Sequence, residues 1–216
     1  MKQRWEHLVG VAGALLLAYG SWLGLFVTPP DRMQGDVMRI MYVHVPAAWA
    51  ALLAFTVAFV AAIVSLWTAR AAWDALLEAC TEVGVVLGIL LLALGSAWAR
   101  PIWGVWWDWD PRLTTSAVLV LAFLGILALR GFVDDARQRA TWSAVAAIVA
   151  FVDVPVVYYS VRWWRSLHQV QSTKSTMDAT MYEALLVNSL AFVLVGTWLV
   201  VRRWRIAREQ QRLEMA

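Results

Sequence analysis

Charge and cysteine are both scarce in this chain. Only 15% of its 216 residues are Asp, Glu, Lys or Arg, whereas a soluble domain has roughly 25%. The single cysteine, Cys80, rules out a disulfide within the chain. The sequence also lacks the Gly-x-x-x-x-Gly-Lys-Ser/Thr motif of an ATPase. These absences exclude an ordinary soluble domain, a disulfide-stabilised scaffold and a P-loop enzyme.

Long apolar runs are what the chain has instead, with 62% hydrophobic residues. Six segments approach the roughly 20 residues that cross a bilayer as a helix, and they lack the polar alternation of a membrane barrel. Lys2 and Arg4 before the first run imitate a signal peptide, but the run is long and we expect a retained helix. With no repeat or long linker, residues 1–216 should form one membrane domain. The sequence therefore predicts an all-α integral membrane protein, a bundle of six transmembrane helices at approximately 8–27, 47–69, 79–99, 113–130, 142–159 and 181–201.

The basic residues predict an orientation for this bundle. If the N-terminus is cytoplasmic, 11 of the 18 Lys and Arg residues lie on the cytoplasmic side. Positively charged loops favour the cytoplasm, so both termini should be inside. Counting helix crossings then places His44, the tryptophan-rich segment 100–113 and His168 together on the outer face. His7 lies on the opposite face, and short inner loops of about ten residues should act as connectors.

The outer segment reads Trp-Gly-Val-Trp-Trp-Asp-Trp-Asp-Pro-Arg at residues 103–112. Such a density of rings suits a large flat apolar ligand with polar edges better than simple membrane anchoring. The alternative is an aromatic belt in which Asp110 and Arg112 form an interfacial salt bridge. If the segment is a short surface helix, one face carries Trp103, Trp106, Trp107 and Asp110.

His44 and His168 each occur in an aromatic-rich stretch. Taken singly, each histidine is most simply an interfacial residue bonded to a neighbour. As a pair facing a flat ligand, two neutral imidazoles are suited to the axial positions of haem iron, and a zinc site lacks a third ligand. Arg39 and Arg112 could bind the haem propionates, or they could meet phospholipid phosphates. Asp153 lies a few residues inside the outer end of the fifth helix, where an ionisable group is a candidate functional residue. It could equally cap backbone groups freed by Pro155, and we favour this structural role.

Three motifs carry a resemblance to a known family. They are Val-His-Val-Pro-Ala at 43–47, Trp-Gly-x-Trp-Trp-x-Trp-Asp at 103–110 followed by Arg-Leu-Thr, and Ser-Val-x-Trp-Trp-x-x-Leu-His-Gln at 160–169. In these and in its six-helix layout the chain resembles cytochrome c maturation protein C, also called haem exporter protein C, of the Trp-Trp-Asp haem-handling family. The resemblance implies transiently bound haem b with His44 and His168 as its two axial ligands. It further implies a periplasmic haem-holding segment made of Trp103, Gly104, Trp106, Trp107, Asp108, Trp109, Asp110 and Arg112.

The resemblance also implies a function and partners. The family presents haem at the periplasmic face of the bacterial inner membrane to a haem chaperone, cytochrome c maturation protein E. It works with an ABC transporter pair, the A and B proteins, and a small D protein, and it is not an enzyme. The chain has no Cys-x-x-Cys-His of its own for covalent haem attachment.

Two other functions stay open from the residues alone. A redox subunit such as a b-type cytochrome usually places its histidines within the membrane, and a haem permease needs polar groups lining its core. Beyond Asp153 and Asn188 the predicted helices look almost wholly apolar. The sequence therefore favours a surface platform over a channel.

Overall fold

The computed structural model describes residues 4–169 and 173–214, and these form helices with no strand. Six helical stretches are long and apolar enough to cross a membrane, so the predicted six-helix membrane bundle is confirmed. The fifth stretch is broken between α5 and α6 at Val152. The elements are α1 (Arg4–Trp22) with a π-helical end (Leu23–Val27), a 3-10 turn (Asp36–Ile40) leading into α2 (Met41–Thr68), α3 (Ala71–Trp103), α4 (Pro111–Phe132), α5 (Ala136–Phe151), α6 (Asp153–Trp163) and α7 (Ala179–Glu214).

The helices are longer, and the inner connections shorter, than the sequence predicted. α3 has 33 residues, about 50 Å at 1.5 Å per residue, whereas the hydrocarbon core is about 30 Å thick. Apolar runs mark only the part of a helix inside the lipid, so the predicted ends fell short. The inner connections shrink to residues 69–70 and 133–135, with Ala69 in the left-handed region (φ 51°) and Asp135 capping α5.

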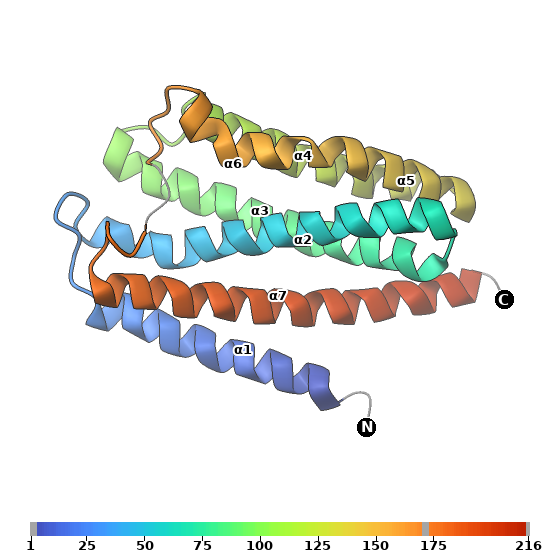
Figure 1. The fold of residues 1–216 in the computed structure, drawn as a ribbon, viewed down its shortest axis with the longest axis horizontal. Coiled ribbons are helices and arrows are strands. Elements are labelled where there is room, and N and C mark those ends of the chain that lie inside the picture. The colour runs from blue at the N-terminus through green and yellow to red at the C-terminus, as the bar shows by residue number, and fades with distance from the viewer. Residues whose placement is uncertain (1–3, 170–172, 215–216) are drawn as a thin grey trace.

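The helices form three groups that lie side by side (Figure 1). α2 and α3 run through the middle, α1 packs along α7 on one side, and α4, α5 and α6 cover the other. The loops that follow α3 and α6 and the loop that precedes α2 gather at one end, whereas α1 begins and α7 ends at the other. The prediction that His44, the tryptophan segment and His168 share one face is thus confirmed.

Small residues let the central helices approach closely, as membrane helices require. Phe55 of α2 stacks on Phe123 of α4 with ring centroids 4.0 Å apart. A side chain at Gly84 of α3 would come within 2.5 Å of the Phe55 ring. The stacked pair therefore fits beside α3 because α3 has no side chain at that point.

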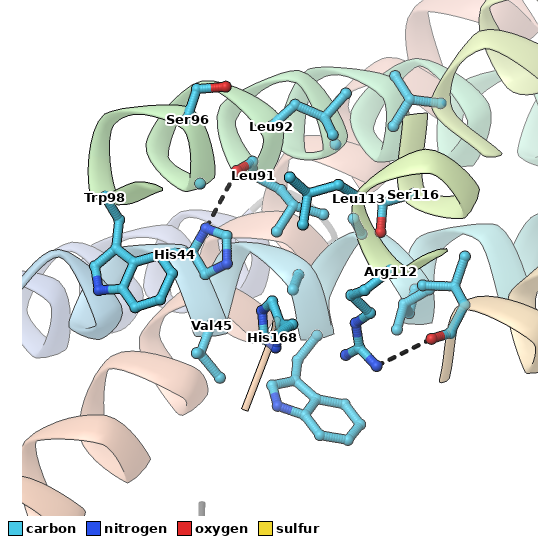
Figure 2. A pocket seen from close by; sticks show the side chains of 18 of the residues that line it. His44, Val45, Leu91, Leu92, Ser96, Trp98, Arg112, Leu113, Ser116 and His168 are labelled. Atoms are coloured by element: carbon cyan, nitrogen blue, oxygen red, sulfur yellow. Dashed lines mark hydrogen bonds between the residues drawn. The ribbon is translucent and has the colours of Figure 1, made fainter. Parts of the chain in front are cut away.

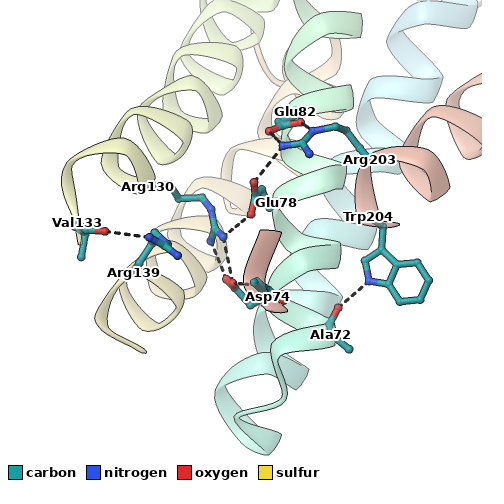
Figure 3. A network of polar contacts seen from close by, with 10 residues as sticks. Ala72, Asp74, Glu78, Glu82, Arg130, Val133, Arg139, Arg203 and Trp204 are labelled. Carbon is teal, nitrogen blue, oxygen red and sulfur yellow. Dashed lines mark hydrogen bonds and ion pairs between the residues drawn. The ribbon is translucent and has the colours of Figure 1, made fainter. Parts of the chain in front are cut away.

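A network of ion pairs joins α3, α4 and α7 toward the end of the bundle where α7 ends (Figure 3). Arg130 contacts Asp74 at 2.7 Å and Glu78 at 2.6 Å, and Arg203 contacts Glu78 and Glu82. The three carboxylates follow one another at four-residue spacing on one face of α3, and Glu82 lies inside the segment predicted as apolar. The expectation of an almost wholly apolar core was wrong here, because opposite charges from different helices neutralise one another.

Asp153 does not have the capping role favoured by the sequence. It begins α6, but the preceding Val152 occupies the cap position and no side-chain cap bond forms. Its Oδ2 atom is buried without a hydrogen-bond partner.

Candidate functional site

A cavity opens between α2, α3, α4 and the loop after α6, at the end of the bundle where the loops before α2 and after α3 and α6 gather. Its volume is about 180 Å³, and its walls are mostly aliphatic and aromatic. Phe55 lies at its deep end, and the polar side chains that line it include His44, His168 and Arg112. Figure 2 shows the two histidine rings and Arg112 directed into this space from different parts of the chain.

His44 enters the cavity from the first turn of α2. The helix begins at Met41, so His44 lies inside it and Pro46 in its second turn; the expectation of a helix beginning after His44 was wrong. The preceding 3-10 turn, Asp36–Ile40, extends the helical stretch outward. The Nδ1 atom of His44 lies 3.1 Å from the carbonyl oxygen of Leu91 in α3 (Figure 2).

His168 enters from the opposite side, on the loop that follows α6. Its Nδ1 atom lies 2.8 Å from the carbonyl oxygen of Gln169. Burial is the main cause that lowers the pKa of His168, and the positive charge of Arg112 lowers it further. The Gln169 bond and Asp110 act in the opposite direction but do not outweigh burial. The imidazole is therefore neutral at pH 7, the form that binds metals.

The hydrogen bonds fix the same tautomer for both rings. A carbonyl oxygen can only accept, so Nδ1 carries the proton in His44 and in His168. Each Nε2 atom then keeps a lone pair. This is the usual arrangement of a metal-binding histidine, whose second nitrogen donates to a backbone carbonyl. Among the described residues no group of three or more His, Cys, Asp or Glu could hold a metal ion.

The tryptophan segment is not the short surface helix that its spacing suggested. α3 continues through Trp103 and ends at Gly104, whose φ of 80° lies in the left-handed region that favours glycine. Residues 107–110 have no regular structure. The physical reason is the glycine, which turns the chain out of the helix. Its N–H donates to the carbonyl of Arg100 at 3.1 Å.

This turn divides the tryptophans into two sets. Trp103 and Trp107 line the cavity. Trp106 and Trp109 are 62% and 80% exposed and lie outside it. The single aromatic face expected for Trp103, Trp106 and Trp107 is therefore wrong, because the chain is not helical after residue 103. Of the neighbouring residues Trp106 and Trp107, only Trp107 lines the cavity.

Asp110 is the most buried residue of the segment, at 4% exposure. It caps α4 by accepting the backbone N–H of Arg112 at 2.8 Å, with Pro111 in the first helical position. The same carboxylate accepts from the Ser166 hydroxyl and from the Leu167 N–H. Asp108, in contrast, is half-buried and makes no hydrogen bond within the part of the chain described.

The two arginines predicted near the site have different surroundings. Arg112 lines the cavity and donates to the carbonyl oxygens of Val157 at 2.9 Å and Tyr158 at 3.2 Å. Arg39 lies outside the cavity lining and binds Asp36 at 2.9 Å, as well as a carbonyl at the end of the first span. The structure therefore brings Arg112, but not Arg39, to the histidine pair.

Sequence reasoning missed residues that hold this end of the bundle together. Gln34 accepts the Trp98 indole N–H at 2.9 Å and donates to Gln169 at 3.5 Å, which ties the first outer loop to the loop of His168. Gly95 of α3 faces His44, and a Cβ there would lie 3.1 Å from the Cε1 atom of the ring. The available signal was a Gly-Ser pair at the end of an apolar run, which alone does not reveal its partner.

Comparison with known proteins is consistent with these motifs. The family model described as Heme exporter protein C matches residues 1–216. A Heme exporter protein C of Bradyrhizobium diazoefficiens is 35% identical over 94% of this chain and 80% of its own. That of Escherichia coli K12 is 33% identical over 91% and 81%. A ccmC-like mitochondrial cytochrome c biosynthesis protein of Marchantia polymorpha is 29% identical over 88% and 83%.

Proposed function

The chain belongs to the Heme exporter protein C family, and on that premise we propose that it binds haem between His44 and His168 and delivers it for c-type cytochrome biogenesis. The recipient is a periplasmic haem chaperone, cytochrome c maturation protein E. Haem is cargo here, so the protein acts as a binding and transfer component and not as an enzyme. One observation carries the proposal: two histidines from distant parts of the chain line one cavity, each with Nδ1 committed to a carbonyl.

The remaining wall chemistry suits a porphyrin with its propionates. Trp103 and Trp107 offer flat apolar rings for stacking. Arg112 offers a guanidinium in a partly desolvated position, where its attraction for a carboxylate is strengthened. Haem b with two neutral imidazoles as axial ligands is the form that this donor set fits. The chemistry of its guanidinium group makes Arg39 a candidate propionate partner, but its side chain lies outside the cavity lining, so the geometry lends it no support.

The size of the cavity favours transfer over storage. Its volume of about 180 Å³ is below the roughly 300 Å³ at which pockets begin to enclose a whole drug-sized ligand. A porphyrin held by the histidines would leave part of its edge outside. We propose that the exposed Trp106 and Trp109, with Gly104 and Asp108, form the rim at which the chaperone takes over the ligand.

We place the site on the periplasmic side of the bacterial inner membrane, with both termini in the cytoplasm. The bias of basic residues supports this orientation. Reporter fusions at residues 36 and 174 should be periplasmic, and a fusion within 133–135 should be cytoplasmic. The reverse pattern would overturn the orientation while leaving the shared face intact. The A and B transporter proteins and the small D protein are proposed partners on the strength of the family resemblance.

The two alternative functions have less support. The cavity ends at Phe55, which is stacked on Phe123, and ion pairs occupy the inner part of the bundle. A permease carrying haem through its own core would need a path past both. A b-type cytochrome subunit that passes electrons to another haem would need a second pair of histidines, and the described residues place just one pair around a cavity.

The ligation test uses the three histidines. Purified protein should give the spectrum of six-coordinate, low-spin haem, and His44→Ala or His168→Ala should each convert it toward a five-coordinate form. Added imidazole should restore the lost ligand. The matched control is His7→Ala, since His7 is exposed on α1 at the opposite end. If both cavity variants keep the unaltered spectrum, the axial assignment is wrong.

A further inference from the structure

Asp110 is the last residue of the tryptophan motif at 103–110, and its carboxylate side chain is buried. Both oxygens are used: Oδ1 accepts from the Arg112 N–H at 2.8 Å and from the Ser166 hydroxyl at 3.0 Å, and Oδ2 accepts from the Leu167 N–H at 2.6 Å. With 4% exposure and three donors, the side chain is satisfied within the protein. It does not line the cavity. A direct contact with haem would require breaking these bonds.

The donors from Ser166 and Leu167 lie next to His168, a proposed haem ligand. Leu167 is the neighbour of His168, and the Ser166 hydroxyl that donates to Asp110 also accepts the His168 backbone N–H at 3.0 Å. The Leu167 side chain contributes little to holding this loop, since it is 57% exposed. Because the carboxylate is charged, its hydrogen bonds are stronger than those between neutral groups. One side chain thus fastens the start of α4 to the backbone that carries the second histidine.

We propose that Asp110 is a positioning residue for His168: it acts through Ser166 and Leu167 to hold that imidazole opposite His44, and it does not touch haem. This inference rests on the proposed ligation by His44 and His168. The tryptophan motif then contains two kinds of residue. Trp103 and Trp107 line the cavity, whereas Asp110 holds the loop that carries His168. The arrangement also explains why the aspartate directly precedes Pro111: the cap of a rigid helix is a fixed point for the loop.

The substitution Asp110→Asn tests this role selectively. Asparagine is as good a helix cap as aspartate, and its Oδ1 atom can still accept from Arg112 and Ser166. The amide nitrogen then replaces Oδ2 and meets the Leu167 N–H, donor against donor. Ser166→Ala removes the other connection. The matched control is Asp135→Asn, because Asp135 caps α5 in the same way, accepting from the Gln138 N–H at 2.7 Å, at the opposite end of the bundle.

Hydrogen exchange gives a readout that needs no haem. In the full-length protein without haem, amides of residues 166–168 should exchange about tenfold faster in Asp110→Asn than in the unaltered protein, because a charge-assisted bond is lost. Asp135→Asn should leave them unchanged. Unaltered exchange in Asp110→Asn would overturn the anchoring role, whatever the fate of the haem proposal.

Spectra of the haem-loaded protein test the link to ligation. Asp110→Asn and Ser166→Ala should each shift haem from low spin toward high spin, and exogenous imidazole should reverse the shift. In a His168→Ala background, Asp110→Asn should add nothing, since the residue acts only through that ligand. A further loss of haem in the double variant, or faster exchange with an unaltered spectrum, would refute the positioning role. If His168→Ala itself leaves the spectrum intact, the proposed function fails first, and the exchange result still decides the anchoring.

Discussion

Substitutions of Gly95 should disturb haem ligation by His44 while changing the free energy of unfolding very little. A Cβ at this position would lie 3.1 Å from Cε1 and 3.7 Å from Nδ1 of His44. Gly95→Ala therefore requires the imidazole to move by a few tenths of an ångström, and Gly95→Val places two more methyl groups in the same space. Metal–ligand distances vary by only about 0.2 Å. A shift of that size is enough to weaken an iron–nitrogen bond.

The effect on stability should be small because two terms oppose each other. Replacing a helical glycine by alanine stabilises the helix by about 1 kcal/mol. Disturbing the hydrogen bond from His44 to Leu91 costs about 0.5–1.5 kcal/mol. The free energy of unfolding in detergent should therefore change by no more than about 1 kcal/mol for the alanine variant.

The assay is the low-spin fraction of bound haem together with its dissociation rate, measured beside thermal unfolding. We expect the order Val, Ala, Gly from most to least disturbed. Gly125→Val in α4 is the control, because nothing lies within 4 Å of a Cβ there. A Gly95→Val protein with an unaltered spectrum and dissociation rate would refute the reasoning, as would an equal loss in the Gly125 variant.

Three further predictions concern pH, charge and aromatic stacking. Burial lowers the pKa of His168 from its ordinary value of about 6.5, so acid should release haem only below about pH 6.5. The free energy of unfolding keeps its full value above that pH and falls below it as the unfolded state takes up the proton. Release of haem already at pH 7.5 in an acid titration would contradict this. Arg130→Met should destabilise the protein by about 3–5 kcal/mol in thermal or detergent unfolding, because it removes the arginine that pairs with the buried Asp74 carboxylate. Arg212→Met breaks an exposed pair worth about 0–1 kcal/mol, and equal effects of the two variants would count against the importance of the buried ion pair. Trp107→Ala should slow haem loading of the purified protein more than Trp109→Ala, since only the former lines the cavity, and the reverse order in a haem-titration assay would place the stacking surface outside.

Much of the candidate site was recoverable from the sequence because it depends on helix count and not on packing. Each crossing of a membrane reverses the side on which the chain emerges, so the joint location of His44 and His168 needed only the number of apolar runs. The pair of histidines at one cavity agrees with that count. The direction in which individual rings point did not follow in the same way, as Trp106 shows by facing outward.

By itself, then, the sequence determined a six-helix membrane bundle, the shared face of its outer loops and, through its motifs, the family. These properties follow from the hydropathy and the order of residues along the chain. Only the tertiary structure decided that Gly104 ends α3 and splits the tryptophans, that Asp110 is bonded to the loop of His168, and that charged side chains of three helices pair inside the bundle. Those outcomes depend on which distant groups come within hydrogen-bonding distance, and no local pattern records that.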